Sequence, residues 1–268
     1  MRPVLFRLGA LEVPTHGFFV GLGVAVAALV FLLEARSRGR LDQHTLVAVC
    51  GALVGGAIGM RLSGLLPHLS PTANPTLAQA WEFGARSILG GLTGAYVGVL
   101  VAKRIIGYRV RTGDLFAPAV AIGMAVGRVG CYLTEAPGRP TSLPWAVHAP
   151  ASVPECAGCL SGVGMHPSHL YEIAFQLAAF GLLYWLKPRI TAPGMLLILY
   201  LAAYAVFRFA VEFTRANPTV WLELTRPQWF LLPFLPLIGW RLVRHYRRGV
   251  FDTVLHRRPT VEREVIAS

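Results

Sequence analysis

The chain has 268 residues, of which 54% are hydrophobic and only 14% are charged. A soluble domain carries about a quarter charged residues, so this composition excludes an ordinary soluble protein and indicates a membrane protein. The formal net charge of +12 suits nucleic acid or anionic lipid as a partner. The positions of the basic residues decide between these two classes.

Seven apolar segments approach the length of about 20 residues that a membrane-spanning helix needs. They cover approximately residues 15–34, 45–66, 87–105, 114–134, 169–187, 193–213 and 227–244. Two stretches, 51–59 and 90–98, repeat small residues at every fourth position, which predicts close helix packing in lipid. We therefore expect an all-α polytopic membrane protein with about seven transmembrane helices.

The basic residues outside these segments lie mainly on one side. If the first helix runs from the outside of the membrane to the inside, the loops, helix ends and tail on the inner side carry 16 of the 25 Lys and Arg residues. Those on the outer side carry 6. The positive-inside rule then predicts an outside N-terminus and a cytoplasmic C-terminus. The membrane domain spans 1–244, with outer loops at 67–86, 135–168 and 214–226, and 245–268 is a basic cytoplasmic tail. Anionic lipid attracts basic groups so placed, and nucleic acid is not an expected partner.

Apart from the basic residues at the inner ends of the spans, which are counted with the inner segments, three lie inside predicted spans, toward their outer ends: Arg61, Arg128 and Arg208. Arginine within a span costs about 2.5–3.5 kcal/mol and usually faces a bundle interior or a wet cavity. Because a guanidinium donates two parallel hydrogen bonds to phosphate, the three residues predict a site for a phospholipid head group. Two structural alternatives stay open: Arg61 and Arg208 extend to the interface, or Arg208 pairs with Glu212 four residues on.

The segment GRVGCYLTEAPGRPT, residues 127–141, carries the most informative of these arginines. Glycines on both sides of Arg128 allow a ligand to approach the backbone closely. The helix is expected to break at 136–138, before Arg139 at the surface. Irregular backbone near membrane depth is tolerated where it is buried in protein or lines a cavity.

The sequence MHPSHLYE, residues 165–172, is typical of a helix start, because Pro and Ser favour the first turn. His169, Tyr171 and Glu172 then enter the fifth span. Glu172 is costly there without a partner, and an arginine from a neighbouring helix is the natural one. For His166, a capping or surface role and a catalytic role both remain open.

Cys156 and Cys159 lie in the long outer loop. A local disulfide on the oxidising side is the first expectation. Two free thiols are an alternative, and so is a metal held together with His166 and His169, although the spacing is shorter than in zinc fingers. We expect no resident metal and no cofactor.

Three motifs in this order resemble the bacterial prolipoprotein diacylglyceryl transferases. They are residues 127–141, HPSHLYE at 166–172 and YAVFRFAVEFTR at 204–215, and the resemblance covers roughly residues 15–245. It implies a transferase of the bacterial cytoplasmic membrane that carries out the first step of lipoprotein maturation. Such an enzyme moves a diacylglyceryl group from phosphatidylglycerol to the lipobox cysteine of a prelipoprotein, which forms a thioether and releases glycerol phosphate.

Candidate site residues follow from the motifs and from this resemblance. The catalytic candidates are Arg128, Arg208, Glu135 and His166. The candidates for binding phosphatidylglycerol are Arg61, Arg128, Gly138, Arg139, Tyr171, Glu172, Arg208 and Glu212. By position, both Arg128 and Arg208 match essential arginines of the family.

The chain also departs from the family pattern where the acceptor thiol would be activated. Cys131 and Thr134 stand at asparagine positions, Glu135 falls one place early, Leu89 replaces a histidine proposed as a base, and His16 stands at an aromatic position. The base is left open among His16, His166, His169 and the more remote Glu135. Alternatively, the arginine cluster alone lowers the pKa of the acceptor thiol. Cys131 is either a reactive thiol or a small buried residue. A paralogue with another acceptor, or a protein that binds or moves lipid without catalysis, remains the alternative function.

Overall fold

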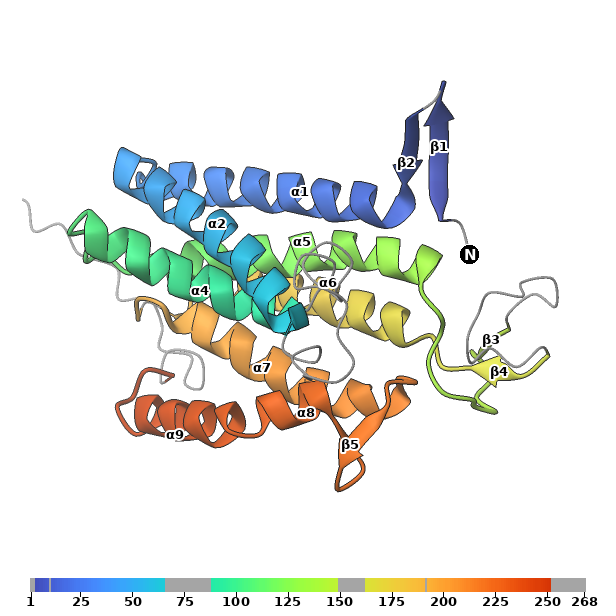
Figure 1. Cartoon of the computed structure of the whole chain (residues 1–268). Helices are drawn as coiled ribbons and strands as arrows, with labels where there is room; N and C mark the ends of the chain where they lie inside the picture. The colour runs from blue at the N-terminus through green and yellow to red at the C-terminus, as the bar shows by residue number, and fades with distance from the viewer. Residues whose placement is uncertain (1–2, 10, 66–87, 149–161, 191, 252–268) are drawn as a thin grey trace, which may run out of the picture. The chain divides into compact units, whose positions relative to one another are not determined.

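The computed structural model describes residues 3–9, 11–65, 88–148, 162–190 and 192–251 (Figure 1). The chain divides into two compact units, residues 1–31 with 113–268 and residues 32–112. Helix α1 (Thr15–Ser37) begins in the first unit and ends in the second. The outer loop expected at 67–86, the pair Cys156 and Cys159, and the tail from residue 252 lie outside the described residues.

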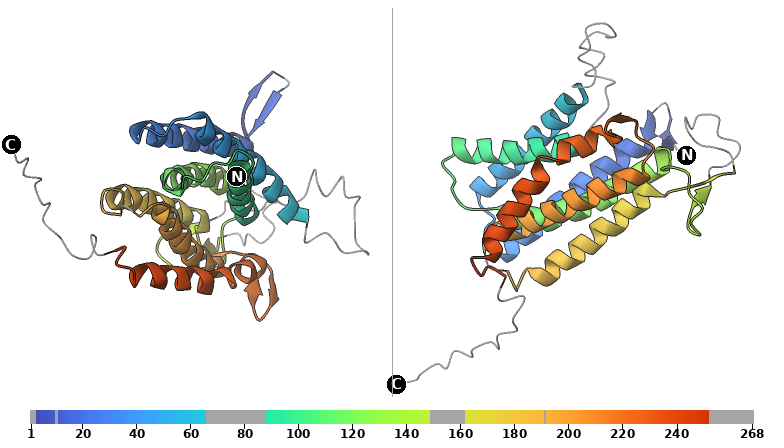
Figure 2. Two further views of the ribbon diagram at one scale, coloured as in Figure 1. Left: turned by 90° about the vertical axis from the view of Figure 1, so that its left-hand side faces the viewer. Right: turned by 90° about the horizontal axis from the view of Figure 1, so that it is seen from below.

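Three helices of the first unit lie side by side (Figures 1 and 2). They are α5 (Gly113–Thr134), α6 (Ser168–Leu186) and α7 (Met195–Val211), which the short 3-10 turn η2 (Glu212–Thr214) continues. At one end, the Asp114 carboxylate accepts hydrogen bonds from the backbone N–H of Gly194 at 2.6 Å and of Leu196 at 2.9 Å. At the other end, Ser168 bonds Thr214. Helices α5 and α7 therefore run in the same direction and α6 runs against them.

The two ends of this helix group differ in chemistry. The end where α7 begins is an apolar core. Its buried members are Ala117, Ala121, Leu183, Ile190, Met195, Leu196 and Tyr200. The end where α6 begins buries polar and charged side chains instead. These are Arg128, Ser168, His169, Glu172, Arg208 and Glu212. Among the described residues of these three helices, the buried charges lie at the end where α6 begins, which marks that end as the candidate site.

Helix α1 packs on α5 through glycines. A Cβ added to Gly23 would lie 2.6 Å from the carbonyl oxygen of Gly123. A Cβ added to Gly130 would lie 2.8 Å from the Phe19 Cβ and 3.3 Å from the His16 Cα. The absence of these side chains lets the two helices approach closely, in opposite directions, and brings the start of α1 to the end of α5.

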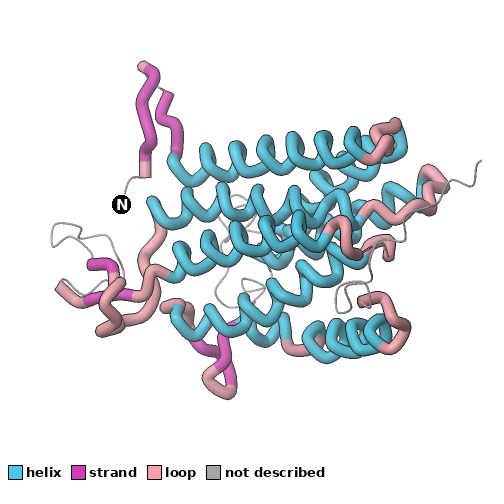
Figure 3. The backbone as a smooth tube through the Cα atoms, turned by 180° about the vertical axis from the view of Figure 1, so that it is seen from behind, coloured by secondary structure: helices cyan, strands magenta, loops and turns pink. Residues whose placement is uncertain are grey.

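Short antiparallel hairpins precede or connect the helices of this unit (Figure 3). They are β1 (Val4–Leu8) with β2 (Leu11–Pro14), β3 (Val147–His148) with β4 (Gly164–Met165), and β5 (Thr219–Trp221) with β6 (Leu224–Thr225). The two residues that join β5 and β6, Leu222 and Glu223, have φ of 48° and 56°. Each described sheet has only two strands, so helices make up most of the described fold, as the sequence predicts.

The seventh predicted span, 227–244, is divided in the structure. It forms two helices, α8 (Arg226–Leu231) and α9 (Phe234–Tyr246), instead of a single one. The division falls at Leu232 and Pro233, because proline has no N–H to donate to the preceding turn. The other six predicted spans agree with described helices to within a few residues.

The second unit is a pair of helices, α2 (Gln43–Leu65) and α4 (Ile88–Ile105), that pack antiparallel through glycine. A Cβ on Gly51 would lie 2.6 Å from the Gly98 carbonyl oxygen, and a Cβ on Gly55 would overlap the Gly94 carbonyl. This close contact is the one that the small residues at every fourth position predict.

Five of the described helical segments are long and apolar enough to cross a membrane. They are Thr15–Ser37, Gln43–Ser63, Ile88–Ile105, Gly113–Thr134 and Met195–Thr214. Helix α6 is not among these five, and it buries His169, Glu172 and Gln176.

Candidate active site

A buried ion pair joins α5 to α6. Arg128 of α5 is 4% exposed and its Nη2 pairs with the carboxylate of Glu172 on α6, which is fully buried. Arg215, just beyond η2, donates from Nη1 to the other carboxylate oxygen of Glu172 at 3.1 Å. The predicted partner of Glu172, an arginine from a neighbouring helix, is therefore confirmed, and a second arginine shares the carboxylate.

A second buried pair lies within one helical turn. Arg208 donates to Glu212, four residues on. The other oxygen of Glu212 accepts hydrogen bonds from the Asn217 side chain at 2.6 Å and from the Thr225 hydroxyl at 2.9 Å. The structural alternative for Arg208 is thus the arrangement observed. Because hydrogen bonds also hold Glu212, the pair fixes the direction of the Arg208 guanidinium.

Arg215 lies among three carboxylates. Its guanidinium is 3.1 Å from Glu172, 3.7 Å from Glu135 and 3.9 Å from Glu212. With Arg128 and Arg208, the cluster contains three arginines and three glutamates, so its formal charges cancel. From the sequence, Arg215 was counted with the outer segments and seen to continue the face of Arg208 and Glu212 by one turn, but its contacts with Glu135 and Glu172 were not predicted. Its spacing of three residues from Glu212 is the signal that places both on one helix face.

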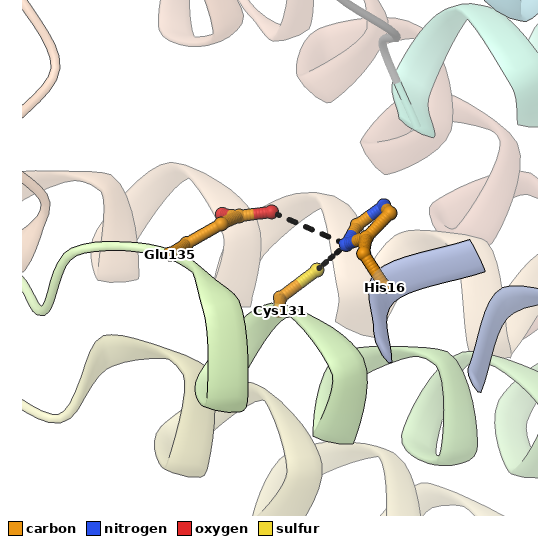
Figure 4. Close-up of side chains that lie close together, drawn as sticks. All are labelled: His16, Cys131 and Glu135. Carbon is orange, nitrogen blue, oxygen red and sulfur yellow. Dashed lines mark hydrogen bonds and ion pairs between the residues drawn. The ribbon is translucent and has the colours of Figure 1, made fainter. Parts of the chain in front are cut away.

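A histidine, a cysteine and a glutamate meet beside this cluster (Figure 4). The Nδ1 atom of His16, at the start of α1, lies 3.9 Å from the Sγ of Cys131 and 3.9 Å from the Oε1 of Glu135. The other Glu135 oxygen contacts Nε2 of His169 at 3.0 Å. The hydrogen bond with His169 lowers the pKa of the Glu135 carboxyl to about 2. Arg128 is also near, with Nη1 3.8 Å from the Cys131 sulfur.

Gly138 and Arg139 fasten the loop after α5 to the other elements of the site. The Gly138 N–H donates to the His166 carbonyl at 2.7 Å, and the Arg139 N–H donates to the Thr214 carbonyl at 2.7 Å. Arg139 Nε also donates to the carbonyl of Arg215 at 3.0 Å. A Cβ on Gly138 would overlap the Thr214 carbonyl oxygen, so the contact requires glycine. The loop holds the exposed Arg139 guanidinium at the border of the cluster.

Two predicted residues form a separate polar group at the start of α6. The His166 ring Nδ1 lies 3.2 Å from the Tyr171 hydroxyl, which also accepts from the Trp145 indole N–H at 2.8 Å. Among the described residues, the His166 ring has its hydrogen bond with Tyr171 and not with the arginine–glutamate cluster. His166 as the base stays a prediction, whereas the structure brings His16 and His169 to Glu135.

Arg61 and Leu89 belong to the second unit. Arg61 lies near the end of α2, and Leu89 lies in the first turn of α4. The two units are described separately, so the expected convergence of Arg61 with Arg128 and Arg208 stays a prediction.

Three buried polar atoms of the cluster are without a hydrogen-bond partner among the described residues. One is Oε2 of Glu172, which forms the ion pair with Arg128, and the other two are donors, Nε of Arg128 and the hydroxyl of Tyr204. Tyr204 is 2% exposed and lies within electrostatic range of Arg128, Arg208 and Glu172. Buried donors are nearly always satisfied in folded proteins, so these two donors suit a ligand that supplies acceptor oxygens. Tyr204 opens the motif at 204–215, but it was not among the predicted site residues, because an uncharged tyrosine in an apolar span does not by itself demand a partner.

These features define a polytopic membrane protein whose helices bury a neutralised arginine–glutamate cluster at one end. Residues 3–243 match the family described as prolipoprotein diacylglyceryl transferase. The chain belongs to this family, as the sequence motifs indicated.

Known relatives agree over most of the chain. A protein of Bordetella bronchiseptica is 32% identical over 256 residues, which cover 87% of this chain and 91% of the relative. One of Chromohalobacter salexigens is 34% identical over 228 residues, covering 80% and 79%. One of Coxiella burnetii is 33% identical over 265 residues, covering 91% and 95%. Each of the three is named phosphatidylglycerol–prolipoprotein diacylglyceryl transferase.

Proposed function

We propose that this chain transfers a diacylglyceryl group from phosphatidylglycerol to the lipobox cysteine of a prolipoprotein. Its relatives are named for phosphatidylglycerol and prolipoprotein. We further propose that it resides in the bacterial cytoplasmic membrane with its N-terminus outside. The site end, where α1 and α6 begin and α5 and α7 end, then faces the outer side, where a translocated acceptor arrives.

One observation carries the proposal. The formal charges of the cluster cancel, yet the Nε–H group of the buried Arg128 has no hydrogen-bond acceptor among the described residues. Glu172 holds one side of its guanidinium, and Nε is left without a partner among the described residues. The Tyr204 hydroxyl is left in the same state. Arg139 provides a second, exposed guanidinium. In this assignment Arg128 and Tyr204 donate to the phosphate of the lipid, and Arg139 receives the head group at the surface.

The reaction makes one bond and breaks one. The sulfur of the acceptor attacks the glycerol carbon of the diacylglyceryl group that carries the phosphate. The carbon–oxygen bond breaks, and glycerol phosphate leaves with the electron pair on oxygen. Its charge increases as it leaves, so fixed guanidinium donors stabilise the transition state more than the bound lipid.

The thiol must lose its proton, because the thiolate is the nucleophile. The groups near Arg128 that suit this step are the imidazoles of His16 and His169, each of which contacts Glu135. Glu135 is the weaker base, because its pKa is lowered. Glu172 and Glu212 are positioning residues in this scheme, because each directs the guanidinium of an arginine.

The test is direct lipid transfer. The purified protein is reconstituted in vesicles that contain phosphatidylglycerol, a synthetic lipobox peptide is added, and the peptide mass is measured. We expect a diacylglyceryl adduct on the cysteine, and none with a serine peptide or with vesicles of phosphatidylethanolamine alone. Absence of the adduct, with a Bordetella relative active in the same assay, would refute the proposal.

Arg128→Lys keeps the charge but loses the planar pair of donors. We expect the transfer rate to fall by about 100- to 1,000-fold, the loss typical for removing one donor to a developing anion. The matched control is Arg7→Lys, since Arg7 is 70% exposed in a surface pair with Glu12. Equal rates for the two variants would remove Arg128 from the site.

A second candidate function keeps the lipid donor and changes the acceptor. Cys131 and Leu89 favour it, because both stand where the family resemblance implies residues near the acceptor thiol. In the absence of its own acceptor, this paralogue would pass the diacylglyceryl group to water, which releases glycerol phosphate and diacylglycerol from the vesicles and leaves the peptide without lipid. Quantifying glycerol phosphate in the same reactions separates the two functions.

A further inference from the structure

We propose that His16, Cys131 and Glu135 form a zinc site that activates the acceptor thiol, an inference whose functional part rests on the proposed transferase activity. No metal was expected from the sequence. The site therefore arises from the fold, which brings the first turn of α1 to the end of α5 (Figure 4).

The three side chains offer the ligand types that zinc prefers. Imidazole nitrogen, thiolate sulfur and carboxylate oxygen are its usual protein ligands, and they bind with tetrahedral geometry. The imidazole Nδ1 lies 3.9 Å from both the Cys131 sulfur and the Glu135 Oε1, and the three ligand atoms all lie within 4.8 Å of one another.

A bound zinc requires only a small contraction of this arrangement. Usual zinc bond lengths at tetrahedral angles place ligand atoms about 3.3–3.6 Å apart. The His16 and Glu135 side chains are each 39% exposed, so either of them has room to rotate toward the buried Cys131.

The backbone of α5 also allows His16 to approach Cys131 closely. The turn of α5 that carries Cys131 begins next to Gly130, where a side chain would press on Phe19 and His16. Gly130 therefore allows the His16 ring to lie over the thiol.

Outer partners hold the carboxylate in the orientation that coordination needs. Oε2 of Glu135 contacts His169 at 3.0 Å and Arg215 at 3.7 Å, which leaves Oε1 on the His16 side. Metal ligands in proteins commonly have such outer contacts, and their loss lowers metal affinity by about 10- to 100-fold.

The charges balance as well. The thiolate of Cys131 and the carboxylate of Glu135 together offset the two charges of zinc. Arg128, 3.8 Å from the Cys131 sulfur, offsets the further negative charge that an incoming thiolate adds.

Three protein ligands leave the fourth zinc position open, as in catalytic zinc sites. A water or hydroxide there is replaced by the acceptor sulfur: zinc-bound hydroxide and the thiol give zinc-bound thiolate and water. Coordination to zinc deprotonates a thiol outright, so no histidine base is needed. The chain carries Leu89 at the position where the family resemblance implies a histidine base. The bound thiolate then attacks the lipid carbon as described above.

The site is tested first by metal binding, on full-length protein from which any affinity tag has been cleaved. Zinc content is measured by mass spectrometry, and cobalt substitution reports thiolate ligation through its near-ultraviolet charge-transfer band. We expect one zinc per chain and a thiolate–cobalt band. Cys131→Asn, which restores the residue that the family pattern has, should lose the band and weaken zinc binding by at least about 100-fold. His16→Phe should weaken zinc binding to a similar degree without removing the thiol.

Two controls separate this site from other cysteines. Cys50 is an exposed free cysteine on α2, and Cys50→Ser should keep one zinc and the band. The double variant Cys156→Ser with Cys159→Ser should also keep both. A wild type without stoichiometric zinc, zinc retained by Cys131→Asn, or zinc lost from the double variant would each overturn the site.

The role in transfer is tested in the vesicle assay. Wild type treated with a chelator should lose most of the transfer rate and regain it when zinc is restored. Full activity without metal would overturn the thiol-activating role. A zinc-loaded protein that lipidates no lipobox peptide would instead refute the proposed function and leave the metal site standing.

Discussion

The α2–α4 contact and the contact among α5, α6 and α7 hold helices together by opposite means. The first brings backbone against backbone through glycine, and no residue of the described α4 is buried. The second buries arginines and glutamates at one end and an apolar core at the other. Glycine contacts cost little to form and serve packing alone, whereas buried charge is expensive and marks function.

The largest effect should come from the charged contact. In Glu172→Gln the Arg128 guanidinium loses its carboxylate partner within the bundle. Removing one member of a buried pair costs about 3–5 kcal/mol, because the remaining charge is uncompensated. A large fall in unfolding temperature in detergent micelles, together with loss of lipid transfer, is the expected result. An unchanged unfolding temperature would mean that the cluster does not hold α5 and α6 together.

A smaller effect is expected at the loop that borders the cluster. Gly138→Ala places a methyl group against the carbonyl oxygen of Thr214, which is backbone and cannot rotate away. Overpacking of this kind costs about 1–3 kcal/mol and would displace Arg139 from the site. The rate of lipid transfer should therefore fall by more than the modest loss of stability alone would cause. The control is Gly181→Ala on α6, where a Cβ meets nothing within 4 Å. If both variants transfer lipid at the wild-type rate, the loop does not position Arg139.

In the glycine contact between α2 and α4, two neighbouring variants of α4 should change the stability in opposite directions. Gly94→Ala presses on the backbone of Gly55 and Gly59 and should destabilise by about 1–3 kcal/mol. Gly91→Ala meets the Met60 side chain at 3.6 Å, an ordinary contact, and should stabilise the helix by about 0.5–1 kcal/mol. The unfolding temperatures of the two purified variants, compared with that of the wild type, test both expectations. Destabilisation by both would show that α4 packs on both of these faces.

Much of the architecture follows from the sequence alone. Six of the seven predicted spans correspond to described helices, because apolar length and terminating Pro, Gly and charge are local signals. The division of the last span at Pro233 was missed, since a proline within an apolar run is compatible with both a continuous and a broken helix.

The site was predicted in part. Arg128, Glu172 and the Arg208–Glu212 pair stood out because a charge in an apolar span needs a partner, whatever the fold. Arg215 did not stand out, because a basic residue beyond the end of a span is ordinary in sequence. Its three carboxylate neighbours are Glu135 just after α5, Glu172 on α6 and Glu212 in the turn after α7.

The sequence by itself determined the membrane class, the family motifs and the buried charges, because each depends on residues close together in the chain. Tertiary structure alone decided which of the candidate histidines meet Glu135 and which one pairs with Tyr171. It alone brought His16 to Cys131, 115 positions apart in the chain. That meeting depends on how closely α1 and α5 approach through Gly23, Gly123 and Gly130, a property of two packed helices that no local pattern specifies.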